Sequence, residues 1–163
     1  MKRQLIFFTL AIAVIALGLN IADAANKPTL EGVNLGTYVT GPKVSADDLK
    51  GKVVVFEYWG DRCPPCLRSI PHMTSLAAEH GDKVVFVANQ VWTKNVDAAA
   101  KAWKGKAKND LVSVVNHGAL PGAKVKGVPH AFVFNAAGEM VWHGHPMSGL
   151  DKAIDKALAQ GSV

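Results

Sequence analysis

Two cysteines separated by two prolines, Cys63-Pro-Pro-Cys66, are the residues of this chain best suited to chemistry. A pair at this spacing can be a redox-active dithiol, half of a metal site or a structural cross-link. The chain has 163 residues and only 2 Cys, so no second cysteine pair is present to complete a zinc site. A disulfide over so short a loop stabilises a fold by only about 2 kcal/mol. Reversible thiol–disulfide exchange is therefore favoured, and the metal and structural interpretations remain as alternatives.

The place of the pair in the chain indicates how one thiol would be activated. Residues 53–58 are an apolar run typical of a buried strand, and helical spacing predicts a helix over residues 64–80. Cys63 then lies where the strand gives way to the helix, so the helix dipole and free N–H groups favour its thiolate. Lowering a thiol pKa from about 8.5 to about 7 requires only ~2 kcal/mol. We expect Cys63 to attack and Cys66, one turn further on, to resolve the mixed disulfide.

Strand and helix patterns alternate along the rest of the chain. The sequence predicts helices over residues 64–80 and 95–103 and a last helix that Ser148 caps, with strands near residues 37–40, 53–58, 83–91, 111–115, 130–135 and 139–143. This order of elements predicts an α/β fold, in which a mixed central sheet carries helices on both faces. We expect a single domain over residues 25–163.

Residues 1–24 have the pattern of a secretory signal peptide. A basic start is followed by an uncharged stretch over residues 5–19 and then by Ala22-Asp23-Ala24, a cleavage signal. The alternative is an uncleaved membrane anchor, but fifteen helical residues cover roughly 22 Å, less than the ~30 Å of a bilayer core. Cleavage would lower the net charge from +5 to +4. That charge gives no reason to expect a nucleic-acid partner, and export to the periplasm would let a disulfide persist.

The segment Gly127-Val128-Pro129 precedes the strand predicted at residues 130–135. A cis bond before Pro129 would turn the chain into that strand, close to the dithiol. The backbone of Val128 would then be free to hold an incoming substrate strand. The alternative is an ordinary trans proline that limits an edge strand.

Glu57 is the one charged residue in the apolar run of residues 53–58. Burial would raise the pKa of its carboxyl group and suit it to carry a proton to or from Cys66. The alternative is a carboxylate that reaches water from the edge or end of the strand.

The sequence Trp59-Gly-Asp-Arg-Cys63-Pro-Pro-Cys66, with Gly127-Val-Pro129 further on, resembles the thioredoxin fold and, within it, the exported TlpA/ResA-like thiol-disulfide oxidoreductases. The resemblance covers residues 44–160. It implies that Cys63 is the nucleophile, Cys66 the resolving cysteine and Pro129 a cis-proline beside them.

The resemblance also suggests roles for the neighbours of the dithiol. Trp59 matches a tryptophan that packs near the cysteines, and we place it with Val128 and Pro129 in the expected substrate-binding set. Glu57 stands where thioredoxins keep a buried acidic residue, usually Asp. Arg62 departs from the family, which commonly has an aromatic residue there, and this departure bears on the choice of partner.

The function implied is that of a monomeric periplasmic enzyme that exchanges a dithiol for a disulfide with cysteine-containing exported proteins. The family suggests a reductant of the cytochrome c maturation type, supplied by a membrane electron donor and needing no cofactor. The alternative is a copper-binding or copper-delivery module that uses the cysteine pair with His143, His145 and Met147. A strand that ends in a polar turn is the favoured interpretation of these three residues, and His130 is expected to be solvated.

Overall fold

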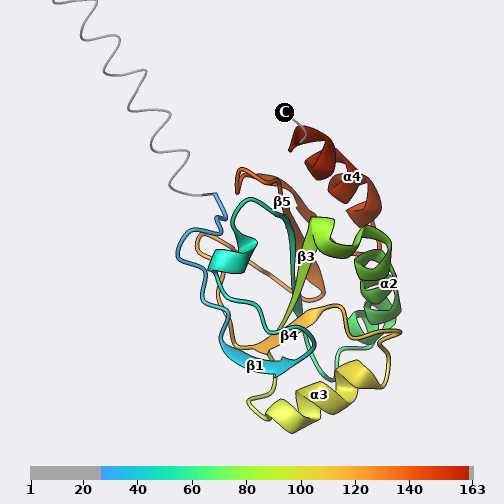
Figure 1. The fold of residues 1–163 in the computed structure, drawn as a ribbon. Helices are drawn as coiled ribbons and strands as arrows, with labels where there is room; N and C mark the ends of the chain where they lie inside the picture. Colours follow the sequence, from blue (N-terminus) through green and yellow to red (C-terminus); the bar gives the residue numbers. More distant parts are fainter. Residues whose placement is uncertain (1–26, 162–163) are drawn as a thin grey trace, which may run out of the picture.

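The computed structural model describes residues 27–161, which form a six-stranded sheet with helices and 3-10 turns around it (Figure 1). The predicted signal peptide and the start of the predicted domain lie outside these residues. The strands are β1 (Thr37–Thr40), β2 (Val53–Trp59), β3 (Val84–Gln90), β4 (Ser113–Asn116), β5 (His130–Phe134) and β6 (Met140–Gly144). No helix within residues 27–161 is long and apolar enough to cross a bilayer.

The sheet is mixed, with the strand order β1-β4-β3-β2-β5-β6. Strands β2, β3 and β4 run parallel, while β1, β5 and β6 each pair antiparallel with a neighbour. Strand β2 lies between β3 and β5, and all seven of its residues are buried. Burial on both faces explains why its sequence is continuously apolar rather than alternating. The predicted α/β class and mixed sheet are confirmed.

Three α-helices cover the sheet: α2 (Pro64–His80), α3 (Val96–Lys104) and α4 (Leu150–Gln160). Two 3-10 turns, η1 (Asp47–Leu49) and η2 (Gly81–Lys83), complete the described helical elements. Asn95 caps α3 as the sequence predicted, because its Oδ1 accepts the Ala98 N–H at 3.0 Å. The predicted cap of α4 is wrong, since Gly149, with φ 97°, precedes that helix and Ser148 makes no capping bond. Glycine adopts this left-handed conformation without steric cost, so it sets the entry to α4.

The two faces of the sheet are covered differently. Alternate residues of β2 contribute to two core clusters, and the cluster that contains Val53, Val55 and Trp59 takes in residues of all three α-helices. The second cluster, around Phe56, takes Leu49 of η1, and loop residues such as Leu120. All three α-helices thus lie on the first face, and the short turn η1 is the helical element on the second face. Helical cover was expected on both faces, and on the second face this short turn supplies it. Right-handed crossovers from β2 to β3 and on to β4 advance in one direction, and they place α2 and α3 on the same face.

Candidate redox site

Cys63 and Cys66 form a disulfide at the junction between β2 and α2. Strand β2 ends at Trp59, a turn closes with the Cys63 N–H bonded to the Gly60 carbonyl at 3.2 Å, and Cys63 is the N-cap of α2. Pro64 and Pro65 occupy the first positions of α2, where the missing N–H groups cost least. The position predicted from the sequence is thus the position observed.

The sulfur of Cys63 takes the place of a capping oxygen. The Cys66 N–H donates to Cys63 Sγ at 3.3 Å, and the positive end of the helix dipole points at the same atom. Both interactions favour negative charge on this sulfur when the disulfide is reduced. Cys63 is only 2% exposed and Cys66 is wholly buried, so a partner must make close contact with the surrounding surface to reach the sulfur.

The loop before β5 lies directly against the dithiol. The carbonyl oxygen of Val128 is 3.6 Å from Cys63 Sγ, and the Val128–Pro129 peptide bond is cis, as expected. Val128 is partly buried and packs against both core clusters. The structure thus brings Val128 and Pro129 to the dithiol, while their part in substrate binding remains a prediction.

Glu57 lies wholly buried on the face of β2 that α2 covers. Its Oε1 lies 3.1 Å from the Ser69 hydroxyl, which also donates to the Cys66 carbonyl at 2.8 Å, and its Oε2 has no partner. Desolvation raises the pKa of Glu57 to about 8, against a smaller opposing effect of the Ser69 hydrogen bond. This burial rules out the alternative in which the carboxylate reaches water. The proton-carrying role of Glu57 remains a prediction.

Ser69 links Glu57 to the second cysteine and was missed in the sequence. It lies three residues after Cys66 on α2, so it shares that residue's helix face, and this spacing is the signal that identifies it. Its single hydroxyl contacts both the carboxyl group and the Cys66 backbone.

We expect Ser69→Ala to raise the pKa of Glu57 further, because the hydrogen bond that lowers it is lost. The variant should also lose about 1–3 kcal/mol of unfolding free energy, since a buried carboxyl group is left without a partner. Carbon-13 NMR of the Glu57 carboxyl group measures the pKa. Ser75→Ala is the matched control, because Ser75 lies on the same helix and bonds only to Pro71 and Lys108. An unchanged or lowered Glu57 pKa would contradict the assigned role of Ser69.

Trp59 belongs to the buried core cluster that also contains Cys63 and Cys66. Its ring is wholly buried and lies 5.2 Å, centroid to centroid, from the ring of Trp103 on α3. The structure confirms the packing expected for Trp59. Its assignment to substrate binding remains a prediction. A buried indole would act there by supporting the turn from Gly60 to Cys63, the cysteine turn, rather than by touching the substrate.

The histidines near Pro129 are arranged differently from the alternative metal set of His143, His145 and Met147. His143 Nδ1 lies 3.1 Å from His130 Nε2 on the neighbouring strand, and His145 Nδ1 accepts the Met147 N–H at 3.2 Å. Partial burial lowers the pKa of His130, and the charges of His143 and His145 add to this effect. Among residues 27–161, no group of three or more His, Cys, Asp or Glu residues could hold a metal ion.

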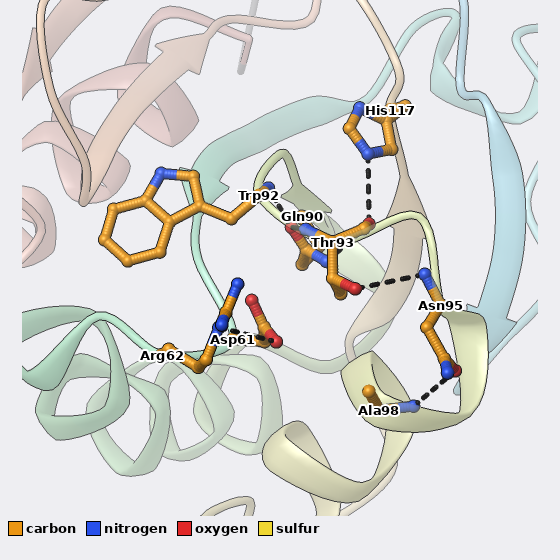
Figure 2. A network of polar contacts seen from close by, with 8 residues as sticks. All are labelled: Asp61, Arg62, Gln90, Trp92, Thr93, Asn95, Ala98 and His117. Carbon is orange, nitrogen blue, oxygen red and sulfur yellow. Dashed lines mark hydrogen bonds and ion pairs between the residues drawn. The ribbon is translucent and has the colours of Figure 1, made fainter.

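A second polar network lies beside the cysteine turn, and the sequence did not single it out (Figure 2). The buried amide of Gln90 receives the N–H groups of Trp92 and Thr93 and donates to the Thr93 carbonyl. His117 contacts the same carbonyl at 3.0 Å. The loop after β3 is thereby held in one conformation.

The sequence of this chain is similar to a known protein family and to thiol-disulfide oxidoreductases. The Redoxin family model matches residues 24–142. The thiol-disulfide oxidoreductase ResA of Bacillus subtilis is 29% identical over 151 residues, which cover 86% of this chain and 84% of that protein. The thioredoxin-like protein YneN of the same organism is 40% identical over 50 residues, 31% of this chain and only 29% of the length of YneN.

Solved structures share the fold at low sequence identity. A thiol-disulfide isomerase from Corynebacterium glutamicum superposes with a TM-score of 0.65 at 17% identity, covering 78% of this chain and 94% of that one. A secreted Mycobacterium tuberculosis disulfide oxidoreductase, described as homologous to Escherichia coli DsbE, gives 0.58 at 19% identity, with 85% and 98% covered. These likenesses confirm the thioredoxin fold that the motif predicted.

Proposed function

Since the chain belongs to the Redoxin family, we propose that it is a thiol-disulfide oxidoreductase that acts on cysteine-containing proteins. One observation carries the proposal: the Cys63–Cys66 disulfide sits at the N-cap of α2, with Cys63 Sγ accepting a backbone N–H and facing the Val128 carbonyl. The resemblance of the motif to ResA-like proteins supports the same activity, and ResA itself is a relative along most of the chain.

The proposed exchange starts from the reduced protein. The Cys63 thiolate attacks one sulfur of a substrate disulfide, which forms a mixed disulfide and releases the other substrate sulfur as a thiolate. The Cys66 thiolate then attacks Cys63 Sγ, which forms the Cys63–Cys66 disulfide and releases the second substrate thiolate. Two electrons pass to the substrate, and a dithiol donor restores the reduced protein by the reverse sequence.

Glu57 supports the second step as a proton carrier. The Cys66 thiol must lose its proton before it attacks, and its buried position excludes bulk water as the acceptor. The pKa of the Glu57 carboxyl group, about 8, is close to the ordinary pKa of a thiol, about 8.5. Proton transfer between the Cys66 thiol and the Glu57 carboxylate therefore costs little free energy.

The cellular setting is part of the proposal. The signal-peptide pattern of residues 1–24 supports export to the periplasm, and cleavage would leave residues 25–163 as a single domain. We propose that the protein is monomeric and acts as a reductant of the cytochrome c maturation type, with a membrane protein as electron donor. The resemblance to exported ResA-like reductants supports this direction of electron flow.

The redox equilibrium with glutathione tests the direction. We expect a reduction potential nearer −270 mV, as for reductants, than −120 mV, as for oxidants, because the resemblance points to reduction. Insulin reduction by the reduced protein is the matching activity assay. A potential near −120 mV, with oxidation of reduced substrate, would reverse the proposed direction while leaving the exchange chemistry intact.

Copper delivery is the second candidate that the sequence left open, although His130 and His143 form only a pair and belong to no group of three metal ligands among residues 27–161. Imidazole and thiolate ligands both suit copper. Equilibrium dialysis separates the candidates: stoichiometric copper retained by the reduced protein, and lost without His143 and His145, would support copper delivery. Insulin reduction that vanishes in Cys63→Ser would support the oxidoreductase.

A further inference from the structure

Trp92 is a large apolar side chain that the fold holds at the surface. It is 51% exposed, whereas Trp59 and Trp103 are buried. Its backbone N–H donates to Gln90 Oε1 (Figure 2). The same Gln90 oxygen accepts the Thr93 N–H, and the Gln90 side-chain NH2 donates to the Thr93 carbonyl. A buried side chain therefore fixes the loop that carries an exposed indole, so the ring is presented in a defined place.

The ring of Trp92 lies against the turn that leads to Cys63. A Cβ atom built on Gly60 would come within 2.5 Å of Cδ2 of Trp92, so the indole packs on the bare backbone of that glycine. Gly60 is the residue whose carbonyl accepts the Cys63 N–H. The exposed indole thus adjoins the turn that holds the attacking sulfur.

Arg62 adds a positive charge at the same place. Its side chain is 79% exposed and its Nε lies 3.7 Å from Oδ2 of Asp61, a long ion pair with a carboxylate that is itself only 7% exposed. In Figure 2 the Arg62 side chain and the Trp92 ring extend to the same side of the Gln90 network. The surface beside Cys63 therefore combines a fixed indole face with an exposed guanidinium group.

We propose that Trp92 and Arg62 form a docking surface for an extended polypeptide whose reacting cysteine is flanked by an acidic residue. This inference rests on the proposed function and names its substrate class. Cys63 is 2% exposed, so the partner must lie on these neighbours to reach the sulfur. The indole covers the apolar part of the segment, and the guanidinium pairs with its carboxylate.

Two peptides test the docking surface by kinetics. They contain one intramolecular disulfide and are identical except for Asp or Lys on both sides of the first cysteine. We expect the reduced protein to react about tenfold faster with the Asp peptide, and Arg62→Glu to reverse this preference. In Trp92→Ala, the rate with the Asp peptide relative to that with bis(2-hydroxyethyl) disulfide should fall about tenfold, which corresponds to ~1.4 kcal/mol.

Three further variants make this comparison specific. Gly60→Ala should lower the same ratio, since its methyl group displaces the indole without removing it. Trp92→Phe should restore part of the ratio, because an aromatic face remains. Leu111→Ala is the matched control: Leu111 is 50% exposed, outside the cysteine turn, and its removal should leave the ratio unchanged. Equal rates with the two peptides, or an equal loss in Leu111→Ala, would overturn the docking surface.

Binding without exchange separates this inference from the proposed function. In Cys63→Ser/Cys66→Ser no disulfide exchange is possible, and we expect the Asp peptide to quench tryptophan fluorescence more strongly than the Lys peptide, a difference that should disappear when Trp92→Ala is added. Quenching that persists when the wild-type protein reduces no disulfide would retain the docking surface and refute the oxidoreductase. Reduction of small disulfides without peptide-dependent quenching would refute the docking surface and retain the oxidoreductase.

Discussion

Cys63→Ser should lose disulfide reduction by at least about a thousandfold, because it removes the sulfur that we propose as the nucleophile and thus the covalent intermediate. The expected residual rate is that of the buffer thiols alone. Insulin precipitation and single-turnover reduction of a peptide disulfide both measure it. Residual activity within tenfold of the wild-type rate would exclude Cys63 as the nucleophile.

Cys66→Ser should behave differently from Cys63→Ser, although each variant lacks one cysteine. Cys63 can still attack, but no second thiol is present to release the substrate, so a mixed disulfide should accumulate. Non-reducing electrophoresis and intact mass measure this adduct, and Ser75→Ala is a control from the same helix that keeps both cysteines. Adducts that form in Cys63→Ser but not in Cys66→Ser would exchange the assigned roles.

Glu57→Gln should change how the stability of the protein depends on pH. Burial raises the pKa of Glu57 to about 8 from its ordinary 4.5, so the folded state keeps a proton that the unfolded state releases. The wild-type protein therefore loses stability as the pH rises from 4.5 to 8, by about 5 kcal/mol over the whole interval. Glutamine does not ionise, so the variant avoids this loss, and its advantage over wild type should grow across the interval.

Urea unfolding of the oxidised protein at pH 4.5, 6 and 8 measures this difference. Glu79→Gln is the matched control, because it makes the same change of side chain at an exposed position on α2. Curves for wild type and Glu57→Gln that run parallel from pH 4.5 to 8 would show that Glu57 does not hold its proton in the folded state.

The elements that hold the dithiol were predictable because local patterns define them. The apolar run of β2, the prolines at the start of α2 and the cap at Asn95 are signals within a few residues, and the structure contains each of them. The position of Cys63 at the strand-to-helix junction follows from these signals alone. Burial of Glu57 was one of two interpretations that the sequence left open, and the structure decides in its favour because β2 is covered on both faces.

The features that were missed depend on contacts between distant segments. The placement of α2, α3 and α4 on one face follows from the strand order, which no local pattern contains. The His130–His143 contact depends on how β5 pairs with β6, and the sequence did not indicate this cross-strand pair. The sequence analysis did not single out Trp92, since only the fold shows its ring packed on Gly60.

The hydrogen bond from the Cys66 N–H to Cys63 Sγ has a thermodynamic consequence for the whole domain. Folding and reduction close a cycle, so any interaction that favours the thiolate in the native protein over the denatured chain shifts the couple by the same free energy. Because Cys63 Sγ completes the first turn of α2, the difference in unfolding free energy between the reduced and oxidised protein and the shift in reduction potential on folding measure the same free energy. Unfolding free energies of the oxidised and reduced forms, compared side by side, would report the potential of the native couple relative to that of the denatured chain.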